Sequence, residues 1–389
     1  MSTMTRTYLD WNATAPLLPA VRDAFVCALD MHGNPSSVHK EGRAVRAAIE
    51  SARRDVAALV GAQASHTIFT SGATEAANLV LSPAFRMGRS ALSIGHLYVS
   101  AIEHPAVREG GRFDKGNVSE IAVTADGILD LAKLEAALSS HDASRGLPMV
   151  ALMLVNNETG IIQPVADAAG LVHAAGGLLV VDAVQAVGRI AVDIEALGAD
   201  FLIVSSHKIG GPKGMGALIS RGEVMMPKPL IHGGGQEKGH RSGTENTSAI
   251  IGFGTAASEA ARHLDAEAQR LNGLRTMLED AMRVAAPDVI IHGADAARVS
   301  NTTFFTVPGL KSETGQIAFD IEGIALSAGA ACSSGKVGES HVLTAMGHDP
   351  KLGALRISLG AATTQTDIER AISAFAKIAG RRKLVVQAA

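Results

Sequence analysis

Residues 199–215, which read ADFLIVSSHKIGGPKGM, decide the fold. The stretch begins with the apolar run 201–204, which is typical of a strand buried on both faces. It continues into Ser205, Ser206, His207 and Lys208, and then into a glycine-rich loop. A lysine just past a buried strand lies where open α/β sheets bind ligands, outside the carboxyl ends of the strands. Apolar walls lower the pKa of a lysine amine, and a neutral amine can form a Schiff base. A surface lysine in a loop fits this stretch equally well.

The same succession of an apolar run and a polar cluster recurs through the first two thirds of the chain. Strands are predicted at 67–69, 97–101, 149–155 and 178–181, and helices at 21–31, 40–60 and 164–175. This alternation predicts an α/β fold with a mostly parallel central sheet and crossover helices. The polar residues that follow the strands should then meet at one sheet edge; they are His104, Asn157, Asp182, Gln185, Ser205, His207 and Lys208.

Residues 70–76, TSGATEA, form a glycine turn that opens a helix after the strand 67–69. Free backbone N–H groups and the positive end of the helix dipole suit a phosphate there, next to Ala73, and Thr74 can add its hydroxyl. An ordinary helix start with Ser71 or Thr74 as its cap is the alternative.

The composition excludes several classes of protein. With 47% hydrophobic and 19% charged residues and a formal net charge of −3, the chain is globular and lacks the basic excess of a nucleic-acid-binding surface. Its longest apolar runs are too short to span a membrane, and no secretory signal is visible at the N-terminus. The two cysteines support neither a disulfide framework nor a cysteine-type zinc site, so we expect no metal and a cytoplasmic location.

The pattern changes after a long predicted helix at 255–284. Strands at 289–292, 302–307, 324–327 and 355–359 predict a smaller α+β domain, and Thr366 with Glu369 forms a capping box for a final helix. We therefore expect a large domain at 13–256, and a small domain made of 1–12 and 257–389. Between them the segment 230–247 is glycine-rich and polar without periodicity, and long loops of that kind are usually functional or disordered.

The two cysteines lie in different settings. Cys27 falls inside the predicted helix 21–31, and we expect it in the core. Cys332 lies in 327–340, SAGAACSSGKVGES, whose small polar composition cannot bury itself. An exposed cysteine is well placed for a nucleophile if nearby positive charge, with Lys336 and His341 as the candidates, favours its thiolate. An incidental surface cysteine is the alternative.

Arg356 lies in the predicted strand 355–359, where alternation puts it and Ser358 on the face opposite the leucines. A rigid guanidinium on a strand can grip a carboxylate with two hydrogen bonds. An edge-strand arginine in solvent is equally consistent with the pattern.

The motifs of this chain resemble those of the cysteine desulfurases, enzymes of the class V aminotransferase group that use pyridoxal 5'-phosphate. The matching segments run in family order from position 8 to position 360, nearly the whole chain. The cysteine loop is similar to that of the branch with a long mobile loop. The segments are YLDWNATAP, GNPSSVH, FTSGATEAAN, EHPAV, VNNETG, VVDAVQAVG, SSHKIGGPKGMGAL, GGGQEKGHRSGTEN, GAACSSG, ESHVLTAMG and RISLG.

The resemblance implies a homodimeric transferase of fold-type I architecture, in which the large domain binds pyridoxal phosphate and the small domain carries the cysteine loop. Lys208 would hold the cofactor and remove the substrate Cα proton, and Asp182 would pair with the pyridinium nitrogen. Gln185 would bind the ring hydroxyl, and His104 would stack on the ring. The phosphate would be held by Ala73, Thr74, Ser205 and His207, with Thr244 reaching it from the other subunit. Asn157 and Arg356 would bind the substrate carboxylate.

The implied activity converts L-cysteine to L-alanine and leaves the sulfur on Cys332 as a persulfide. A protein sulfur acceptor such as an iron–sulfur scaffold would take it, for iron–sulfur cluster or thio-cofactor synthesis. A selenocysteine lyase, or another class V aminotransferase-like enzyme, is the alternative. A non-enzymatic scaffold would be expected to lack Lys208, Asp182 or Cys332, and all three are present. The chain departs from the family where Trp11 replaces a frequent Asn, Ala15 a frequent Thr and Ala330 a frequent Ser, but no proposed chemical group is lost.

Overall fold

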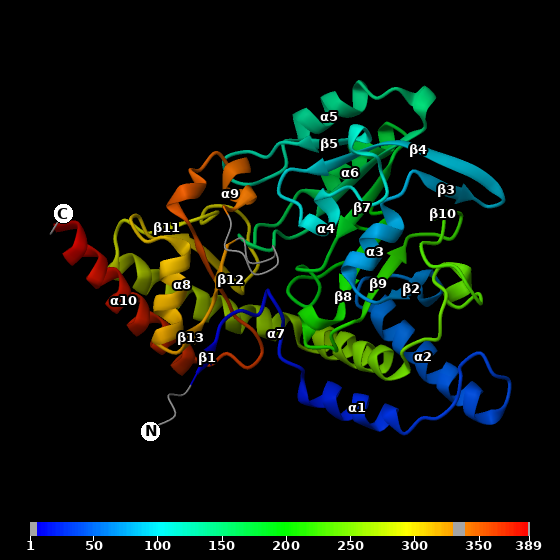
Figure 1. The fold of residues 1–389 in the computed structure, drawn as a ribbon, viewed down its shortest axis with the longest axis horizontal. Helices are drawn as coiled ribbons and strands as arrows, with labels where there is room; N and C mark the ends of the chain where they lie inside the picture. Colours follow the sequence, from blue (N-terminus) through cyan, green and yellow to red (C-terminus); the bar gives the residue numbers. More distant parts are fainter. Residues whose placement is uncertain (1–5, 330–338, 388–389) are drawn as a thin grey trace.

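A computed structural model describes residues 6–329 and 339–387 and shows a larger and a smaller lobe (Figure 1). The larger lobe is built on a nine-stranded sheet of order β10-β3-β4-β6-β7-β8-β9-β2, with β5 added beside β4. Its strands are β2 (Thr67–Thr70), β3 (Ala84–Met87), β4 (Ser90–Ser100), β5 (Val118–Ile121), β6 (Leu147–Met153), β7 (Leu178–Asp182), β8 (Phe201–Ser205), β9 (Gly216–Ser220) and β10 (Met225–Pro227).

Most strands of this sheet run in one direction. Strands β5 and β6 are parallel to β4, β7 is parallel to β6, and β8 is parallel to β7. Strand β9 is antiparallel to both β8 and β2, and β3 is antiparallel to both β4 and β10. Within the described sheet β3 and β9 therefore run against the other seven strands, and the expected mostly parallel sheet is confirmed.

Alternate residues of the central strands serve two separate cores. Val181 of β7 and Leu202 of β8 pack in one core with helices α2, α6 and α7, whereas Val180 and Ile203 pack in the other with α3. Because both faces are covered, these strands are continuous apolar runs. The helices of this lobe are α1 (Pro19–Leu29), α2 (Lys40–Ala58), α3 (Ala73–Val80), α4 (Pro105–Arg108), α5 (Leu131–Ser139), α6 (Val165–Ala174) and the first part of α7 (Thr247–Ala285).

The smaller lobe holds an antiparallel four-stranded sheet of order β11-β12-β15-β14 and a two-stranded parallel pair of β1 with β13. Its core contains Phe305, Phe319 and Phe375. The elements are β1 (Thr7–Tyr8), β11 (Ile290–Ile291), β12 (Thr302–Thr306), α8 (Ser312–Ile321), β13 (Ile324–Ala325), β14 (Ser327–Ala328), α9 (His341–Ala345), β15 (Leu355–Ser358) and α10 (Gln365–Gln387). Short 3₁₀ helices are η1 (Ala64–His66), η2 (Lys115–Asn117), η3 (Ala143–Arg145), η4 (Ser206–Ile209), η5 (Glu237–Gly239) and η6 (Pro350–Leu352).

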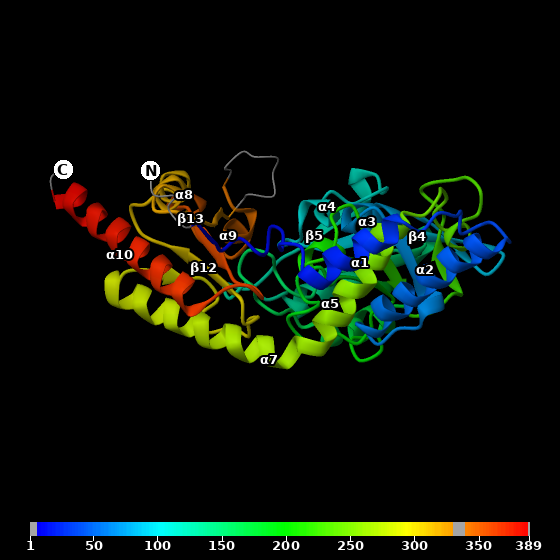
Figure 2. The ribbon, with the colours of Figure 1, turned by 90° about the horizontal axis from the view of Figure 1, so that it is seen from below.

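Helix α7 runs along both lobes (Figure 2). Phe253 near its start packs in a large-lobe core, and Leu278 near its end packs in the small-lobe core. The helix begins at Thr247, earlier than expected, with the Asn246 side chain accepting a hydrogen bond from the Ala249 N–H at 3.2 Å. Glycine lowers helix propensity, and because Gly252 and Gly254 lie in this first part, the sequence pattern did not reveal it as helical. Here Gly254 is needed for packing, because a Cβ would lie 2.6 Å from Ala52. The expected domain boundary near residue 256 falls inside α7 and stays a prediction.

Two local expectations are wrong. Cys27 is exposed and not in the core, because α1 buries the stripe through Val21 and Ala28, and Cys27 lies one residue off that stripe. The cap of α10 is formed by Thr364 and Asp367, not by residues 366 and 369. The Asp367 N–H donates to Thr364 Oγ1 at 3.2 Å, and the Thr364 N–H donates to Asp367 Oδ2 at 2.9 Å, so the reciprocal pair begins two residues earlier.

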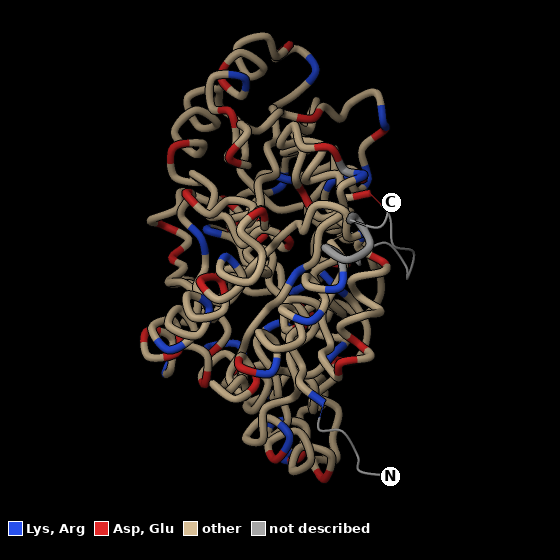
Figure 3. The backbone as a smooth tube through the Cα atoms, turned by 90° about the vertical axis from the view of Figure 1, so that its left-hand side faces the viewer, with Lys and Arg blue, Asp and Glu red and all other residues tan. Residues whose placement is uncertain are grey.

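Basic and acidic residues are interspersed along the described backbone (Figure 3). Within the described ranges, no helix is both long enough and apolar enough to cross a membrane.

Candidate active site

A cavity of about 490 Å³ lies at the carboxyl ends of the central strands, where the two lobes meet. It is lined from elements far apart in the sequence, including β7, β8, the start of α3 and β15 of the small lobe. Ten of the expected site residues line it: Ala73, Thr74, His104, Asn157, Asp182, Gln185, Ser205, His207, Lys208 and Arg356.

Lys208 lies in the short helix η4 directly after β8. The helix ends at Ile209, and the next residue, Gly210, has a φ of +79° that favours glycine; a Cβ there would lie 2.5 Å from Leu18. The Lys208 amine donates hydrogen bonds to the backbone oxygens of Asn12 at 2.6 Å and Ala13 at 2.8 Å. These contacts hold the amine at the cavity wall, so the alternative of a surface lysine is wrong.

Asp182 lines the cavity, and the buried Glu103 lies near enough to feel its charge. Burial raises the pKa of Asp182 to about 6, although a 2.9 Å hydrogen bond from the Val184 N–H and the Lys208 charge both oppose the rise. Burial, and then the charge of Asp182, raise the pKa of Glu103 well above its ordinary value. Glu103 Oε1 accepts from the Met153 N–H at 2.6 Å, while its Oε2 has no hydrogen-bond partner among the described residues. The charge of Asp182 is thus only partly compensated by its neighbours.

The two histidines of the cavity are held neutral at neutral pH. Burial, and then the Lys208 charge, lower the pKa of His104 and of His207 to about 4. His104 is the N-cap of α4, and its Nδ1 accepts from the Ala106 N–H at 3.1 Å, which leaves the ring proton on Nε2. His207 Nδ1 lies 3.1 Å from Thr14 Oγ1.

The start of α3 forms one end of the cavity. Its N-cap is Gly72 without a side-chain hydrogen bond, so neither Ser71 nor Thr74 caps the helix. Strand β9 approaches this turn closely at Gly216, where a Cβ would lie 2.6 Å from the Gly72 carbonyl carbon. Lys213 also lines the cavity, and sequence reasoning missed it, although it stands in the same glycine-rich loop. Helix N–H groups and cations at one end of a cavity suit an anion.

Arg356 also lines the cavity and is 1% exposed. Strand β15 is internal, between β12 and β14, so the alternative of an edge-strand arginine in solvent is wrong. Its Nη2 pairs with Asp10 Oδ1 at 2.8 Å, and its Nη1 donates to the Asn157 backbone oxygen at 2.8 Å. Its Nε has no partner among the described residues, which leaves a buried donor for a ligand carboxylate.

Asn12 links these parts, and sequence reasoning missed it. Its backbone oxygen accepts from Lys208 and, at 3.0 Å, from Gln185 Nε2. Its side chain donates to Thr302 Oγ1 at 2.9 Å and accepts from Arg189 Nη2 at 3.3 Å. The polar cluster after the first short strand was a usable signal, because the other site residues follow strands in the same way.

Two expected site residues are not placed in this cavity by the described part of a single subunit. Thr244 is exposed and does not line it. Cys332, together with Lys336 and Ala330, lies outside the described residues. The described chain resumes at residue 339. The Ser340 hydroxyl donates to the buried Glu158 carboxylate at 2.6 Å. Burial raises the pKa of Glu158 to about 7. His341 Nε2 donates to the Glu103 backbone oxygen at 3.0 Å.

Comparison with known proteins identifies the family. The model of the family "Aminotransferase class-V" matches residues 7–371. A cysteine desulfurase of Cereibacter sphaeroides is 41% identical over 94% of this chain and 94% of its own length. An IscS-like cysteine desulfurase of Mycobacterium tuberculosis is 36% identical over 98% of both chains.

The fold agrees with solved structures of the same kind. A NifS-like protein from Rickettsia africae ESF-5 has a TM-score of 0.86 and 34% identity, covering 96% of this chain and 99% of its own. The expected fold-type I architecture and the resemblance to cysteine desulfurases are therefore confirmed. On its sequence and on its fold, this chain belongs to the aminotransferase class-V family.

Proposed function

We propose that this chain is a pyridoxal-phosphate-dependent cysteine desulfurase, a transferase that converts L-cysteine to L-alanine and passes the sulfur to Cys332. The observation that carries the proposal is the convergence of Lys208, Asp182 and Arg356 on one cavity from three separate elements. The names of the similar proteins, cysteine desulfurases along nearly their whole length, support the substrate. A selenocysteine lyase is not favoured, because the relatives reported above are named for cysteine.

The residues of the cavity fit pyridoxal phosphate. Asp182 is a carboxylate whose raised pKa shows that its charge lacks full compensation, and a pyridinium nitrogen would supply that charge. Gln185 Oε1 is buried without a hydrogen-bond partner among the described residues, and a ring hydroxyl could donate to it. Ala73 and Thr74 at the start of α3, with Ser205 and His207, would hold the phosphate. His104 would lie against the ring.

When bound, the cofactor withdraws electrons from the substrate Cα and so acidifies its proton. Lys208 is the residue that would hold the cofactor and then move the Cα proton, because its amine borders the cavity beside Asp182. Arg356, through its buried Nε, and Asn157 would orient the substrate carboxylate. The neutral His104, with its proton on Nε2, can donate a hydrogen bond from Nε2 without bringing a positive charge to the cavity.

The sulfur step is assigned to Cys332. Its thiolate attacks the substrate sulfur, so that a sulfur–sulfur bond forms while the bond between that sulfur and the substrate carbon breaks. The electron pair stays with the carbon fragment, which takes up protons and leaves as L-alanine. The persulfide on Cys332 would then pass to a protein sulfur acceptor, such as an iron–sulfur scaffold, in the cytoplasm.

A homodimer would complete the site. Thr244 is exposed within the segment 230–247, and the proposal is that it reaches the phosphate in the second subunit. Two ion pairs fix this segment to the larger lobe: Arg241 with Glu75 at 3.0 Å, and the buried Arg53 with Glu237 at 2.6 Å. A shaped and exposed segment of this kind supports a role across a subunit interface.

The cofactor assignment is tested by reducing the purified protein with borohydride and mapping the labelled peptide. The label is expected on Lys208, and Lys208→Ala should neither take the label nor make alanine from L-cysteine. Lys228→Ala is the matched control, because Lys228 is an exposed lysine that does not line the cavity. A label on any lysine other than Lys208 would contradict the assignment.

A further inference from the structure

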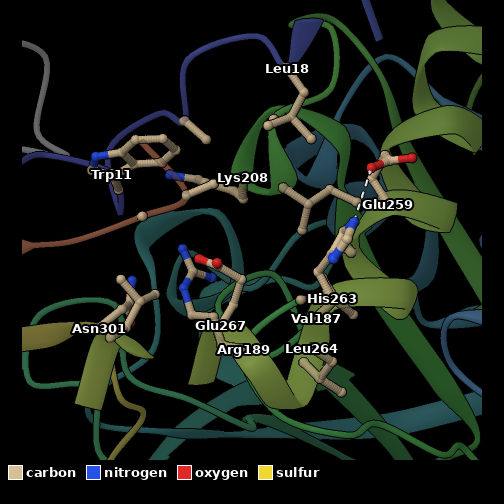
Figure 4. A pocket seen from close by; sticks show the side chains of 18 of the residues that line it. Trp11, Leu18, Val187, Arg189, Lys208, Glu259, His263, Leu264, Glu267 and Asn301 are labelled. Atoms are coloured by element: carbon tan, nitrogen blue, oxygen red, sulfur yellow. Dashed lines mark ion pairs between the residues drawn. The ribbon is translucent and has the colours of Figure 1, made fainter. Parts of the chain in front are cut away.

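A second cavity, the rear pocket, lies against α7 and has Lys208 in its wall (Figure 4). Its volume is about 340 Å³, and Lys208 is the residue that it shares with the candidate active site. Its walls are largely apolar and come from both lobes, with Leu18 and Val187 from one and Leu271 and Leu359 from the other. A concave apolar site with a few polar groups is the usual form of a small-molecule pocket.

Arg189 lines this pocket and is 9% exposed. Figure 4 shows its guanidinium among the side chains that surround the cavity. Its Nη2 makes one long hydrogen bond of 3.3 Å to Asn12 Oδ1, and its Nη1 has no hydrogen-bond partner among the described residues. Burial, and then the charge of Arg356, lower the pKa of Arg189 to about 10, so the group remains charged at neutral pH. A buried cation without an anionic partner is unfavourable, and an anion in the pocket would relieve it.

The acidic residues of the pocket do not supply that anion. Glu267 pairs with Arg270 at 2.8 Å, and Glu259 pairs with His263 at 3.5 Å (Figure 4) and also with Arg262. No described carboxylate lies within ion-pair distance of Arg189. The charge that remains uncompensated at the pocket is therefore the guanidinium.

We propose that the rear pocket binds a small monocarboxylate with an apolar body. The carboxylate would lie toward Arg189, and the apolar body would lie among the leucine and valine walls and beside Trp11. The volume limits the ligand to a small molecule. This site is distinct from the substrate cavity, and the inference does not rest on the proposed function.

A ligand in the rear pocket would change the hydrogen bonding of the Lys208 amine, because Asn12 contacts both Arg189 and Lys208. The Asn12 side-chain oxygen accepts from Arg189, while the backbone oxygen of the same residue accepts from Lys208 and from Gln185. A bound carboxylate would attract the Arg189 guanidinium. That would weaken its hydrogen bond to Asn12, the residue whose backbone oxygen binds the Lys208 amine.

Trp11 provides a direct readout, because it is the single tryptophan of the 389 residues and it lines the pocket. The probe is benzoate, with neutral benzamide of the same shape as the matched control, titrated into the purified full-length protein. We expect a saturable change of tryptophan fluorescence with benzoate, and binding of benzamide weaker by about tenfold or more, since charge-assisted hydrogen bonds are worth that factor.

Four variants separate the possible outcomes. Arg189→Gln should lose the preference for benzoate, and Ala260→Leu, which fills the pocket from α7, should lose binding of both probes. Arg283→Gln removes one positive charge from an exposed position on the same helix, outside the pocket lining, and should bind like the wild type. Arg356→Gln should keep the signal, because Arg356 lines the other cavity.

Three results would overturn the proposal. The first is the absence of a saturable change in the wild type at millimolar benzoate. The second is a signal that survives in Arg189→Gln but disappears in Arg356→Gln, which would place benzoate in the substrate cavity. The third is undiminished binding in Ala260→Leu, which decides the matter if Arg189→Gln fails to fold by circular dichroism.

Discussion

In the cofactor-free protein, the charge of the Asp182 carboxylate should lower the free energy of unfolding. Asp182→Asn removes that charge and should raise the free energy of unfolding again. The rise of the Asp182 pKa from its ordinary 3.8 to about 6 corresponds to about 3 kcal/mol at pH 8. Asparagine is neutral, has the same shape and can still accept the hydrogen bond from the Val184 N–H. The value is an upper estimate, because the side chain borders a cavity that water can enter. Such a stored cost is typical of a group arranged for a ligand and not for the fold.

The direction in which the free energy of unfolding changes with pH follows from the raised pKa of Asp182. The folded protein holds a proton on Asp182 up to a higher pH than the unfolded chain does, so the free energy of unfolding falls as the pH rises from 3.8 toward 6. Asp182→Asn should therefore exceed the wild type by about 3 kcal/mol at pH 8 and by about 1.5 kcal/mol at pH 5, and by almost nothing below about pH 3.

The assay is urea unfolding of the cofactor-free wild type and variant at pH 8 and at pH 5. Asp126→Asn, at an exposed turn position, is the matched control and should change little at either pH. The reasoning is refuted if Asp182→Asn is no more stable than the wild type at pH 8, or if its advantage does not shrink at pH 5. With pyridoxal phosphate added, the order should reverse, because ligand binding stabilises the form that binds it more tightly.

Three further predictions follow from single contacts. Arg356→Gln should raise the KM for L-cysteine by about ten- to hundredfold, since it removes a charged donor to the carboxylate, and an unchanged KM would contradict the role. Glu158→Gln should stabilise the protein by about 3 kcal/mol at pH 8, because burial raises the pKa of Glu158 to about 7; urea unfolding should show the gain fading toward pH 4.5. Arg53→Met should cost about 3–5 kcal/mol in thermal or urea unfolding by leaving Glu237 unpaired, whereas Arg54→Met, at an exposed neighbour, should cost little.

The sequence predicts the site best where a local pattern carries the information. An apolar run such as 201–204 is visible as a buried strand, and parallel strands bring their carboxyl ends to one edge, so Lys208 and Asp182 could be placed together before the structure was known. The same holds for Arg356, whose alternation with its neighbours gives the face it occupies, although its burial inside the small sheet was left open.

Long-range contacts could not be predicted in this way. The bond from Lys208 to Asn12 joins residues 196 positions apart, and no periodicity near residue 12 signals it. The uncompensated charge of Arg189 depends on which carboxylates lie near it after folding. Cys27 was misplaced because a short helix with apolar residues on several faces does not reveal which stripe is buried. In each case the packing of distant elements decided the outcome.

The most direct test of the central claim is anaerobic turnover of L-cysteine by the wild type and by Cys332→Ala. Alanine and sulfide would be followed with dithiothreitol present, and the mass of the Cys332 peptide would be measured without it. The account predicts alanine and sulfide from the wild type, one extra sulfur atom on Cys332, and neither product from the variant. Equal alanine from both proteins would contradict the claim, because Cys332 would then not be the group that accepts the sulfur.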